Sequence, residues 1–251
     1  MNFIKNALSF LLSPIHYLVF GLILVVFHPI QWLAYNIGGY PAHKKVVDCL
    51  NYSLILSLRI LCIRIQFNNP YPLPLDRPLI IVSNHQSMYD ISPLEWYLRA
   101  HHVKFVSKME LGKGIPSVSY NLRHGGSVLI DRKDSKQALS AIRDFGKYLT
   151  THHYSAVIFP EGTRSRNGFP RSFSRNGLKI LMKYTPTALI VPITINNAWK
   201  IQKNGYFRVP LGIRVTFDVH EPFPVDAASF DEIFERLEKT IKSAILLPQK
   251  K

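Results

Sequence analysis

A histidine and an aspartate in one short loop, His85 and Asp90, are the side chains of this sequence best suited to acid–base chemistry. An imidazole oriented by a carboxylate can act as a general base, because the carboxylate fixes which ring nitrogen carries the proton. Both residues follow the apolar run 79–82, which is typical of a buried strand. We therefore predict that His85 is a catalytic base oriented by Asp90. Asp90 also lies where a helix N-cap is expected, and one carboxylate can serve both roles.

Two further polar loops follow apolar runs in the same way. Arg132 comes just after the run 127–130, and the segment 161–164, Glu-Gly-Thr-Arg, comes just after the run 156–158. An arginine guanidinium can bind a phosphate through two parallel hydrogen bonds, and a glycine lets the backbone approach a ligand closely. Taken alone, either loop is equally typical of an ordinary surface turn.

The elements that must position these loops alternate along the chain beyond residue 70. Short β-branched runs predict strands at 79–83, 103–107, 127–130, 156–159, 188–195 and 213–219. Amphipathic stretches between them predict helices at 92–99, 109–123, 135–149, 175–184 and 230–247, with Asp134 as an N-cap. This alternation predicts an α/β fold with a mainly parallel sheet flanked by helices. Ligands bind at the carboxyl ends of such strands, where His85 and Glu161 are expected.

The first 43 residues predict a helical membrane anchor. No Asp, Glu, Lys or Arg occurs from Ala7 to His43. A bilayer span needs about 20 apolar residues, whereas Pro14 and Pro29 lie closer together than that. A single span, a re-entrant helical hairpin and an in-plane anchor therefore remain open. A cleaved signal peptide and a buried core helix are the competing interpretations. The first is disfavoured by a thin positive n-region and the lack of a small-x-small cleavage pattern.

We accordingly divide the chain into an apolar helical segment, residues 1–67, and an α/β domain, residues 68–251. Lysine and arginine outnumber aspartate and glutamate by 31 to 16, and the net charge of +15 favours anionic partners. The apolar N-terminus and the lack of a recognisable nucleic-acid-binding module argue against nucleic acid. Lys44 and Lys45 follow the apolar segment, which predicts a cytoplasmic catalytic part. Cys49 and Cys62 are too few for a thiolate metal site, and we predict no metal.

The order of the polar blocks resembles that of the glycerolipid acyltransferases, in particular the 1-acyl-glycerol-3-phosphate acyltransferases. The matching blocks are His85-x4-Asp90, Gly126-x4-Asp131-Arg132, Glu161-Gly-Thr-Arg164 and Val191-Pro-Ile193, within about 79–195. The resemblance implies that His85 is the general base and that Asp90 orients it. It also implies that the remaining block residues bind the phosphorylated acceptor: Asn84, Gly126, Arg132, Glu161, Gly162, Thr163 and Arg164.

The reaction implied is transfer of a fatty acyl group from acyl-CoA or acyl carrier protein to the free hydroxyl of a lysophosphatidic acid, which forms phosphatidic acid at a membrane. No cofactor is expected beyond this co-substrate. One departure concerns the Phe-Lys-x-Gly segment of many relatives, because this chain has Phe173-Ser-Arg175-Asn-Gly177. Arg175 is the candidate for the missing charge. Glycerol-3-phosphate, lysocardiolipin or a lyso-aminolipid as acceptor, and a non-catalytic basic membrane protein, remain the alternatives.

Overall fold

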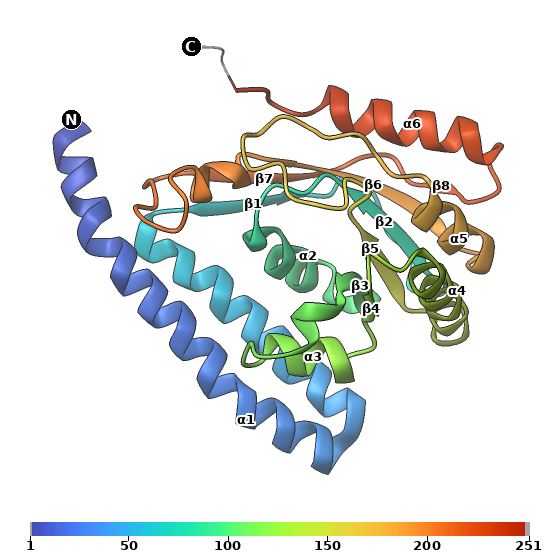
Figure 1. Ribbon diagram of the computed structural model, residues 1–251, viewed down its shortest axis with the longest axis horizontal. Helices are drawn as coiled ribbons and strands as arrows, with labels where there is room; N and C mark the ends of the chain where they lie inside the picture. The colour runs from blue at the N-terminus through green and yellow to red at the C-terminus, as the bar shows by residue number, and fades with distance from the viewer. Residues whose placement is uncertain (1, 249–251) are drawn as a thin grey trace.

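Eight strands rich in β-branched and apolar residues form one sheet in this computed structural model, which describes residues 2–248 (Figure 1). The order is β1-β7-β6-β2-β5-β3-β4, with β8 paired to β6. Only the β6–β7 and β6–β8 pairs are antiparallel, so the predicted mainly parallel sheet is confirmed. The strands are β1 (Arg64–Asn68), β2 (Leu79–Ser83), β3 (Val103–Lys108), β4 (Val128–Ile130), β5 (Ser155–Ile158), β6 (Leu189–Asn196), β7 (Arg214–Val219) and β8 (Phe223–Pro224).

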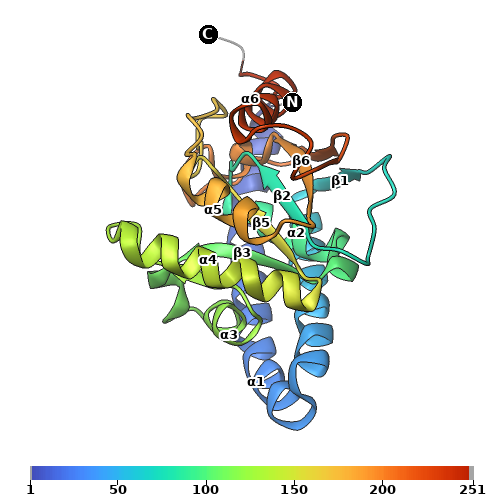
Figure 2. The ribbon, with the colours of Figure 1, turned by 90° about the vertical axis from the view of Figure 1, so that its right-hand side faces the viewer.

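Helices cover both faces of the sheet (Figures 1 and 2). They are α1 (Asn2–Ser57), α2 (Ile91–Tyr97), α3 (Val118–His124), α4 (Ser135–His152), α5 (Asn176–Tyr184) and α6 (Phe230–Ser243), with short 3-10 helices η1 (Leu58–Leu61), η2 (Met88–Asp90), η3 (Arg99–His101), η4 (Met109–Gly112) and η5 (Ala198–Gln202). Along β2, Leu79 and Ile81 face α2 and η1, whereas Ile80 and Val82 face α4, α5 and α6. This alternation buries β2 on both sides and fixes where its carboxyl end emerges.

Glycine and proline account for the main difference from the predicted helices. The expected helix 109–123 is wrong in its first half, because η4 ends at Gly112 and α3 begins only at Val118. Gly114 between them has φ of +80°, and Pro116 cannot donate a helical hydrogen bond. The α4 start is as predicted, since the Asp134 side chain accepts a hydrogen bond from the Gln137 backbone N–H.

The apolar N-terminal region forms a helical hairpin. The chain turns at Gly39, where φ is +60°, and we call residues 2–38 the first arm and 40–57 the second arm. Leu24 of the first arm packs with Leu50 and Leu54 of the second. The helix is apolar and long enough to cross a membrane by length and composition. How this hairpin meets a membrane stays a prediction, and Figure 2 shows its turn projecting away from the sheet.

The hairpin is fastened to the α/β part by polar contacts made by small side chains and one histidine. The Ser9 hydroxyl donates to the Val209 carbonyl over 2.5 Å, and the His16 Nε2 lies 3.0 Å from the Tyr89 hydroxyl. β1 begins at Arg64 and pairs with β7, so the expected domain boundary between residues 67 and 68 falls inside a strand. β1 was not predicted, because its alternating residues were assigned to the preceding apolar segment.

Candidate active site

His85 and Asp90 are brought together where β2 ends. The His85 Nδ1 lies 2.9 Å from the Asp90 Oδ2, and its ring stacks on Phe159 with centroids 4.2 Å apart. The side chain of His85 is 16% exposed, whereas that of Asp90 is fully buried. With Nδ1 donating its proton to the carboxylate, Nε2 keeps a lone pair that can accept one. The pair therefore has the arrangement of a positioned general base.

Asp90 orients His85 as expected, but its carboxylate does not cap α2, because Ser87 is the N-cap of η2 and Asp90 forms no side-chain cap bond with α2. Besides the His85 contact, Oδ2 accepts hydrogen bonds from the Gln86 and Ser87 backbone N–H groups over 2.7 and 2.9 Å. Oδ1 is buried and has no hydrogen-bond partner among the described residues. The carboxylate is thus held by neutral backbone donors, and this fixed position in turn fixes the imidazole.

Glu161 joins the two polar loops. Its Oε1 accepts a hydrogen bond from the His85 backbone N–H over 2.7 Å, and its Oε2 accepts one from the Arg171 backbone N–H over 2.8 Å. Burial raises the pKa of Glu161, and these two donors oppose the shift. Ser165 adds a backbone N–H and a hydroxyl bond to the His85 carbonyl, over 2.8 and 3.0 Å. The backbone of His85 is therefore clamped from both sides by the loop that follows β5.

Neither Asn84 nor Gly126 fits the substrate-binding role predicted for it. Asn84 is fully buried, and its amide bonds both the N–H and the carbonyl of Ile195 over 2.7 and 2.8 Å. It ties the end of β2 to β6 and faces no open space. Gly126 precedes β4 and so lies at the amino edge of the parallel sheet, the edge opposite to His85. A Cβ there would come within 2.7 Å of the Tyr148 hydroxyl, which gives the glycine a packing role.

Glu161 likewise points its oxygens into backbone contacts and not toward an acceptor. Gly162, with φ of +66°, forms the turn after it, and its carbonyl accepts a hydrogen bond from the exposed Arg132 guanidinium. Arg132 therefore lies beside the Glu161 loop, as its place in the sequence suggested. Arg175 lies elsewhere: it pairs with Asp231 of α6, and its guanidinium stacks over Phe234 at 4.5 Å. It does not replace the missing lysine at the site.

An open pocket with three arginines lies in the loop that follows β5, the same loop that clamps the His85 backbone. Its volume is about 420 Å³, and Thr163, Arg164, Arg166, Asn167 and Arg171 line it. Within residues 2–248, none of these arginines forms an ion pair with a carboxylate. Unpaired guanidinium groups around one pocket favour an anion, and a phosphate above all. Arg166 and Arg171 were missed from the sequence because they belong to no motif. The density of arginine in 164–171 was the available signal.

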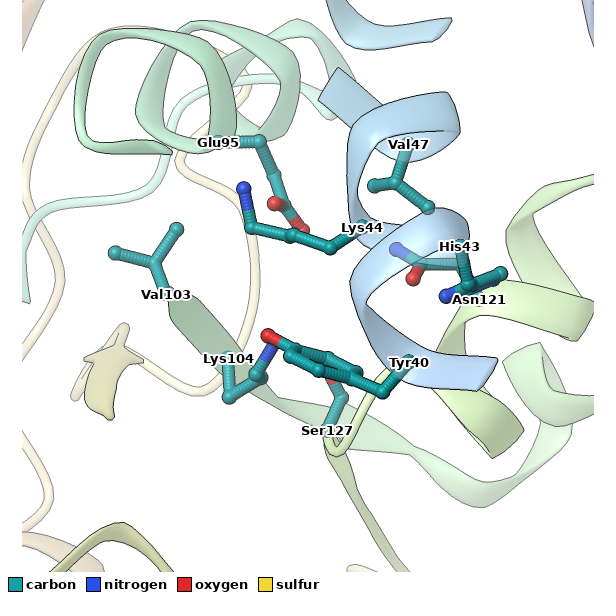
Figure 3. Close-up of a pocket in the computed structure, with 10 residues that line it drawn as sticks. Tyr40, His43, Lys44, Val47, Glu95, Val103, Lys104, Asn121 and Ser127 are labelled. Carbon is teal, nitrogen blue, oxygen red and sulfur yellow. The ribbon is translucent and has the colours of Figure 1, made fainter. Parts of the chain in front are cut away.

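A second polar cluster lies at the amino edge of the sheet, beneath the second arm (Figure 3). We call it the buried charge cluster: Glu95 of α2, Lys104 of β3, and Lys44 and Asp48 of α1. The Lys44 Nζ lies 2.5 Å from the Asp48 Oδ1, and the Lys104 Nζ donates to the Tyr40 hydroxyl over 2.8 Å. Burial raises the pKa of Glu95 and lowers that of Lys104. The enclosed space of about 10 Å³ is too small for a substrate.

Comparison with known proteins gives the same family along most of the α/β part. A family model described as Acyltransferase matches residues 64–196. A 1-acyl-sn-glycerol-3-phosphate acyltransferase of Helicobacter pylori is 32% identical over 168 residues, which cover 64% of this chain and 67% of the relative. A 1-acyl-sn-glycerol-3-phosphate acyltransferase alpha of sheep, Ovis aries, is 30% identical over 68% of this chain and 58% of the relative. The chain thus spans about two thirds or less of the length of these relatives.

A solved structure resembles nearly the whole chain. It is the 1-acyl-sn-glycerophosphate (LPA) acyltransferase PlsC of Thermotoga maritima, with a TM-score of 0.77 over 98% of this chain and 96% of that chain. At 23% identity this likeness concerns the fold, including the hairpin and the sheet.

Proposed function

Because this chain belongs to the acyltransferase family, we propose that it transfers a fatty acyl group from a thioester to the free hydroxyl of a 1-acyl-glycerol-3-phosphate, forming phosphatidic acid. The observation that carries the proposal is the oriented base beside the arginine pocket. His85 supplies a free Nε2, and the loop that clamps its backbone also presents Arg164, Arg166 and Arg171. One region therefore offers a proton acceptor for a hydroxyl and cations for a phosphate.

The proposed reaction is a direct displacement. The acceptor hydroxyl gives its proton to the His85 Nε2 as its oxygen attacks the thioester carbonyl. The carbon–sulfur bond then breaks, and the thiolate leaves with the proton returned by the imidazolium, so that an ester and a free thiol result. Asp90 holds the imidazole in the required tautomer and stabilises its charged form. General-base assistance of this kind contributes about 10² to 10⁴ in rate.

The arginines give the proposal its preference among acceptors. Arg132 and Arg164, proposed from the sequence, lie at the loop that follows β5, and the pocket adds Arg166 and Arg171. A neutral monoacylglycerol would leave these cations unpaired, so a phosphate-bearing acceptor is favoured. The acyl donor is proposed to be acyl-CoA or acyl carrier protein, whose phosphates suit the same positive field. Glycerol-3-phosphate, lysocardiolipin and lyso-aminolipids are the competing acceptors.

We further propose that the protein associates with a membrane through the first arm and that the catalytic part faces the cytoplasm. The outward-facing apolar residues of this arm support the association, since a water-exposed surface of this size is unfavourable. Lys44 and Lys45, which follow the apolar first arm, support the cytoplasmic side. Lys44 itself is buried and paired with Asp48, so Lys45 and the basic remainder carry that inference.

Acceptor identity is tested with membranes containing the full-length protein, one labelled acyl-CoA and a panel of acceptors. Lysophosphatidic acid should be acylated fastest and monoacylglycerol least, and His85→Ala membranes should acylate either at no more than about a hundredth of the wild-type rate. Labelling of glycerol-3-phosphate or lysocardiolipin in preference to lysophosphatidic acid would assign a different acceptor. Turnover by the His85→Ala protein above a tenth of the wild-type rate would contradict the mechanism itself.

A further inference from the structure

The loop that follows η5 carries an exposed aromatic pair that the proposed reaction does not use. Tyr206 and Phe207 are 64% and 46% exposed, and neither belongs to a hydrophobic core cluster. Adjacent exposed aromatic side chains are unfavourable in water unless another phase or partner covers them. We call residues 202–209, which include the last residue of η5, the aromatic loop.

The aromatic loop is docked on the first arm of the hairpin. The Ser9 hydroxyl donates to the Val209 carbonyl, and the Val209 N–H donates to the Ser13 hydroxyl over 3.0 Å. The ring of Phe207 meets that of Phe10 edge-on, with centroids 4.8 Å apart, and Phe10 is itself 59% exposed. Figure 1 shows this orange loop beside the upper part of the blue first arm. The aromatic pair therefore continues the outward apolar surface of the arm.

Only positive charges accompany the aromatic pair. Lys200 and Lys203 are exposed just before it, Arg208 follows it, and no Asp or Glu occurs in residues 198–217. Aromatic rings combined with lysine and arginine are typical of protein segments at the membrane–water interface. Each such cation contributes attraction to anionic head groups, which a neutral protein partner would not use.

We propose that the aromatic loop is a second membrane contact, in which Tyr206 and Phe207 enter the interfacial layer of a bilayer with anionic lipids. Lys200, Lys203 and Arg208 bind the head groups around them. The proposal rests on the proposed membrane association of the first arm, whose exposed face the loop extends. It differs from that association because the loop belongs to the catalytic part of the chain.

The base of the aromatic loop directly contacts residues 85–90, which we call the reactive loop. The Gln202 Oε1 accepts hydrogen bonds from the Ser87 hydroxyl over 3.0 Å and from the Met88 N–H over 3.4 Å. Ser87 and Met88 lie between His85 and Asp90 in the sequence. Insertion of the aromatic loop would therefore hold His85 close to the lipid surface, where a lysophospholipid acceptor resides.

Depth-dependent quenching tests the contact. The full-length protein with Cys49→Ser and Cys62→Ser receives one new cysteine, by Tyr206→Cys or by Asp144→Cys, and an environment-sensitive fluorophore. Asp144 is exposed on α4, which covers the other face of the sheet from α1. In vesicles of phosphatidylcholine and phosphatidylglycerol, spin-labelled lipids should quench the label at 206 and not at 144. Equal quenching at both positions, or none at 206, would overturn the proposal.

Kinetics give an independent test. The double variant Tyr206→Ser, Phe207→Ser should lower kcat/KM by about ten-fold for acceptor in anionic vesicles, because two interfacial rings are lost. A short-chain lysophosphatidic acid dispersed below its micelle concentration should react at the wild-type rate. The matched control is Leu75→Ser, which removes an apolar side chain of 63% exposure from a different loop and should change neither rate.

An equal loss with vesicle-bound and dispersed acceptors would contradict the proposal, since it would indicate damage to the reactive loop. If no acceptor is acylated by any form of the protein, the proposed function fails. The quenching measurement would still decide whether the aromatic loop enters the bilayer.

Discussion

Two buried acidic side chains at opposite edges of one sheet have contrasting surroundings. At the carboxyl edge, Asp90 accepts hydrogen bonds from backbone N–H groups and from His85, which remains open to solvent. At the amino edge, Glu95 is surrounded by the ammonium groups of Lys104 and Lys44 and is covered by the second arm. Neutral backbone donors leave the first carboxylate free to orient a base. The Glu95 carboxylate instead interacts with lysines of α1 and β3, so its role is to join α1, α2 and β3.

The largest expected effect comes from removing the base. His85→Ala should lower kcat by about 10² to 10⁴, while the protein stays folded and membrane-bound. Asp90→Asn should cost less, because it disturbs the imidazole orientation without deleting the base. Single-turnover assays with equal amounts of folded protein measure this. A His85→Ala protein that retains more than a tenth of wild-type turnover would show that His85 is not the general base at the carboxyl edge.

At the amino edge, the corresponding substitution should change stability and leave chemistry intact. Lys104 is 3% exposed, and Lys104→Met removes the cation that most strongly opposes the raised pKa of Glu95. Loss of one partner of a buried charge pair costs on the order of 3 kcal/mol of the free energy of unfolding. Thermal unfolding in detergent should show a lower midpoint, with kcat of the folded fraction unchanged. A selective fall in kcat would mean that the two edges are functionally linked.

Phosphate binding by the arginine pocket gives a further test at the carboxyl edge. Arg164→Lys keeps the charge but loses one of two parallel hydrogen bonds, so the acceptor KM should rise and the donor KM should stay nearly constant. Arg164→Ala should cost about 1.5 to 3 kcal/mol, or roughly ten-fold to a hundred-fold in acceptor kcat/KM. Monoacylglycerol, which lacks a phosphate, is the control acceptor. Equal losses with both acceptors would make Arg164 structural.

The smallest expected effect is a pH dependence of stability at the amino edge. Burial raises the pKa of Glu95 to about 7, so the folded protein holds this proton more tightly than the unfolded chain, whose glutamates titrate near 4.3. The contribution of Glu95 is therefore complete below that value and is lost as pH rises toward about 7. The difference in unfolding free energy between wild type and Glu95→Gln should change by at least about 1 kcal/mol across this window. A constant difference would contradict a raised pKa.

Much of the sheet was predictable from the sequence because its strands carry the signal on their own residues. The runs 79–83 and 103–107 match β2 and β3 within one residue. β2 is buried on both faces and is therefore almost wholly apolar, whereas β3 is recognisable by its β-branched and aromatic residues Val103, Phe105 and Val106. β1 was missed because Arg64, Gln66 and Asn68 alternate with apolar residues at the end of a long apolar segment. The Gly39 turn was not predicted either, although Gly38-Gly39 followed by Pro41 is a typical turn signal.

The candidate site shows which contacts a sequence motif can predict and which it cannot. His85 and Asp90 lie five positions apart directly after a predicted strand, and this context together with the spacing predicts the contact. Glu161 belongs to an equally recognisable motif, yet its partners are the backbone N–H groups of His85 and Arg171. Because every residue type except proline has a backbone N–H, such a contact cannot be predicted from the sequence. The same holds for Asn84 and Ile195, which are 111 positions apart. Positioning residues of this kind are easily taken for ligand-binding ones.

The contact between Ser9 and Val209 has a consequence for how the protein is made. These residues are 200 positions apart, so the first arm is synthesised long before the loop that fastens it. At 5 to 20 residues per second, the interval is roughly 10 to 40 s. During this time the Ser9 hydroxyl of the apolar arm lacks the Val209 carbonyl as its partner. We therefore expect the hairpin to reach the lipid phase first, and the rest of the chain to assemble onto it as translation ends.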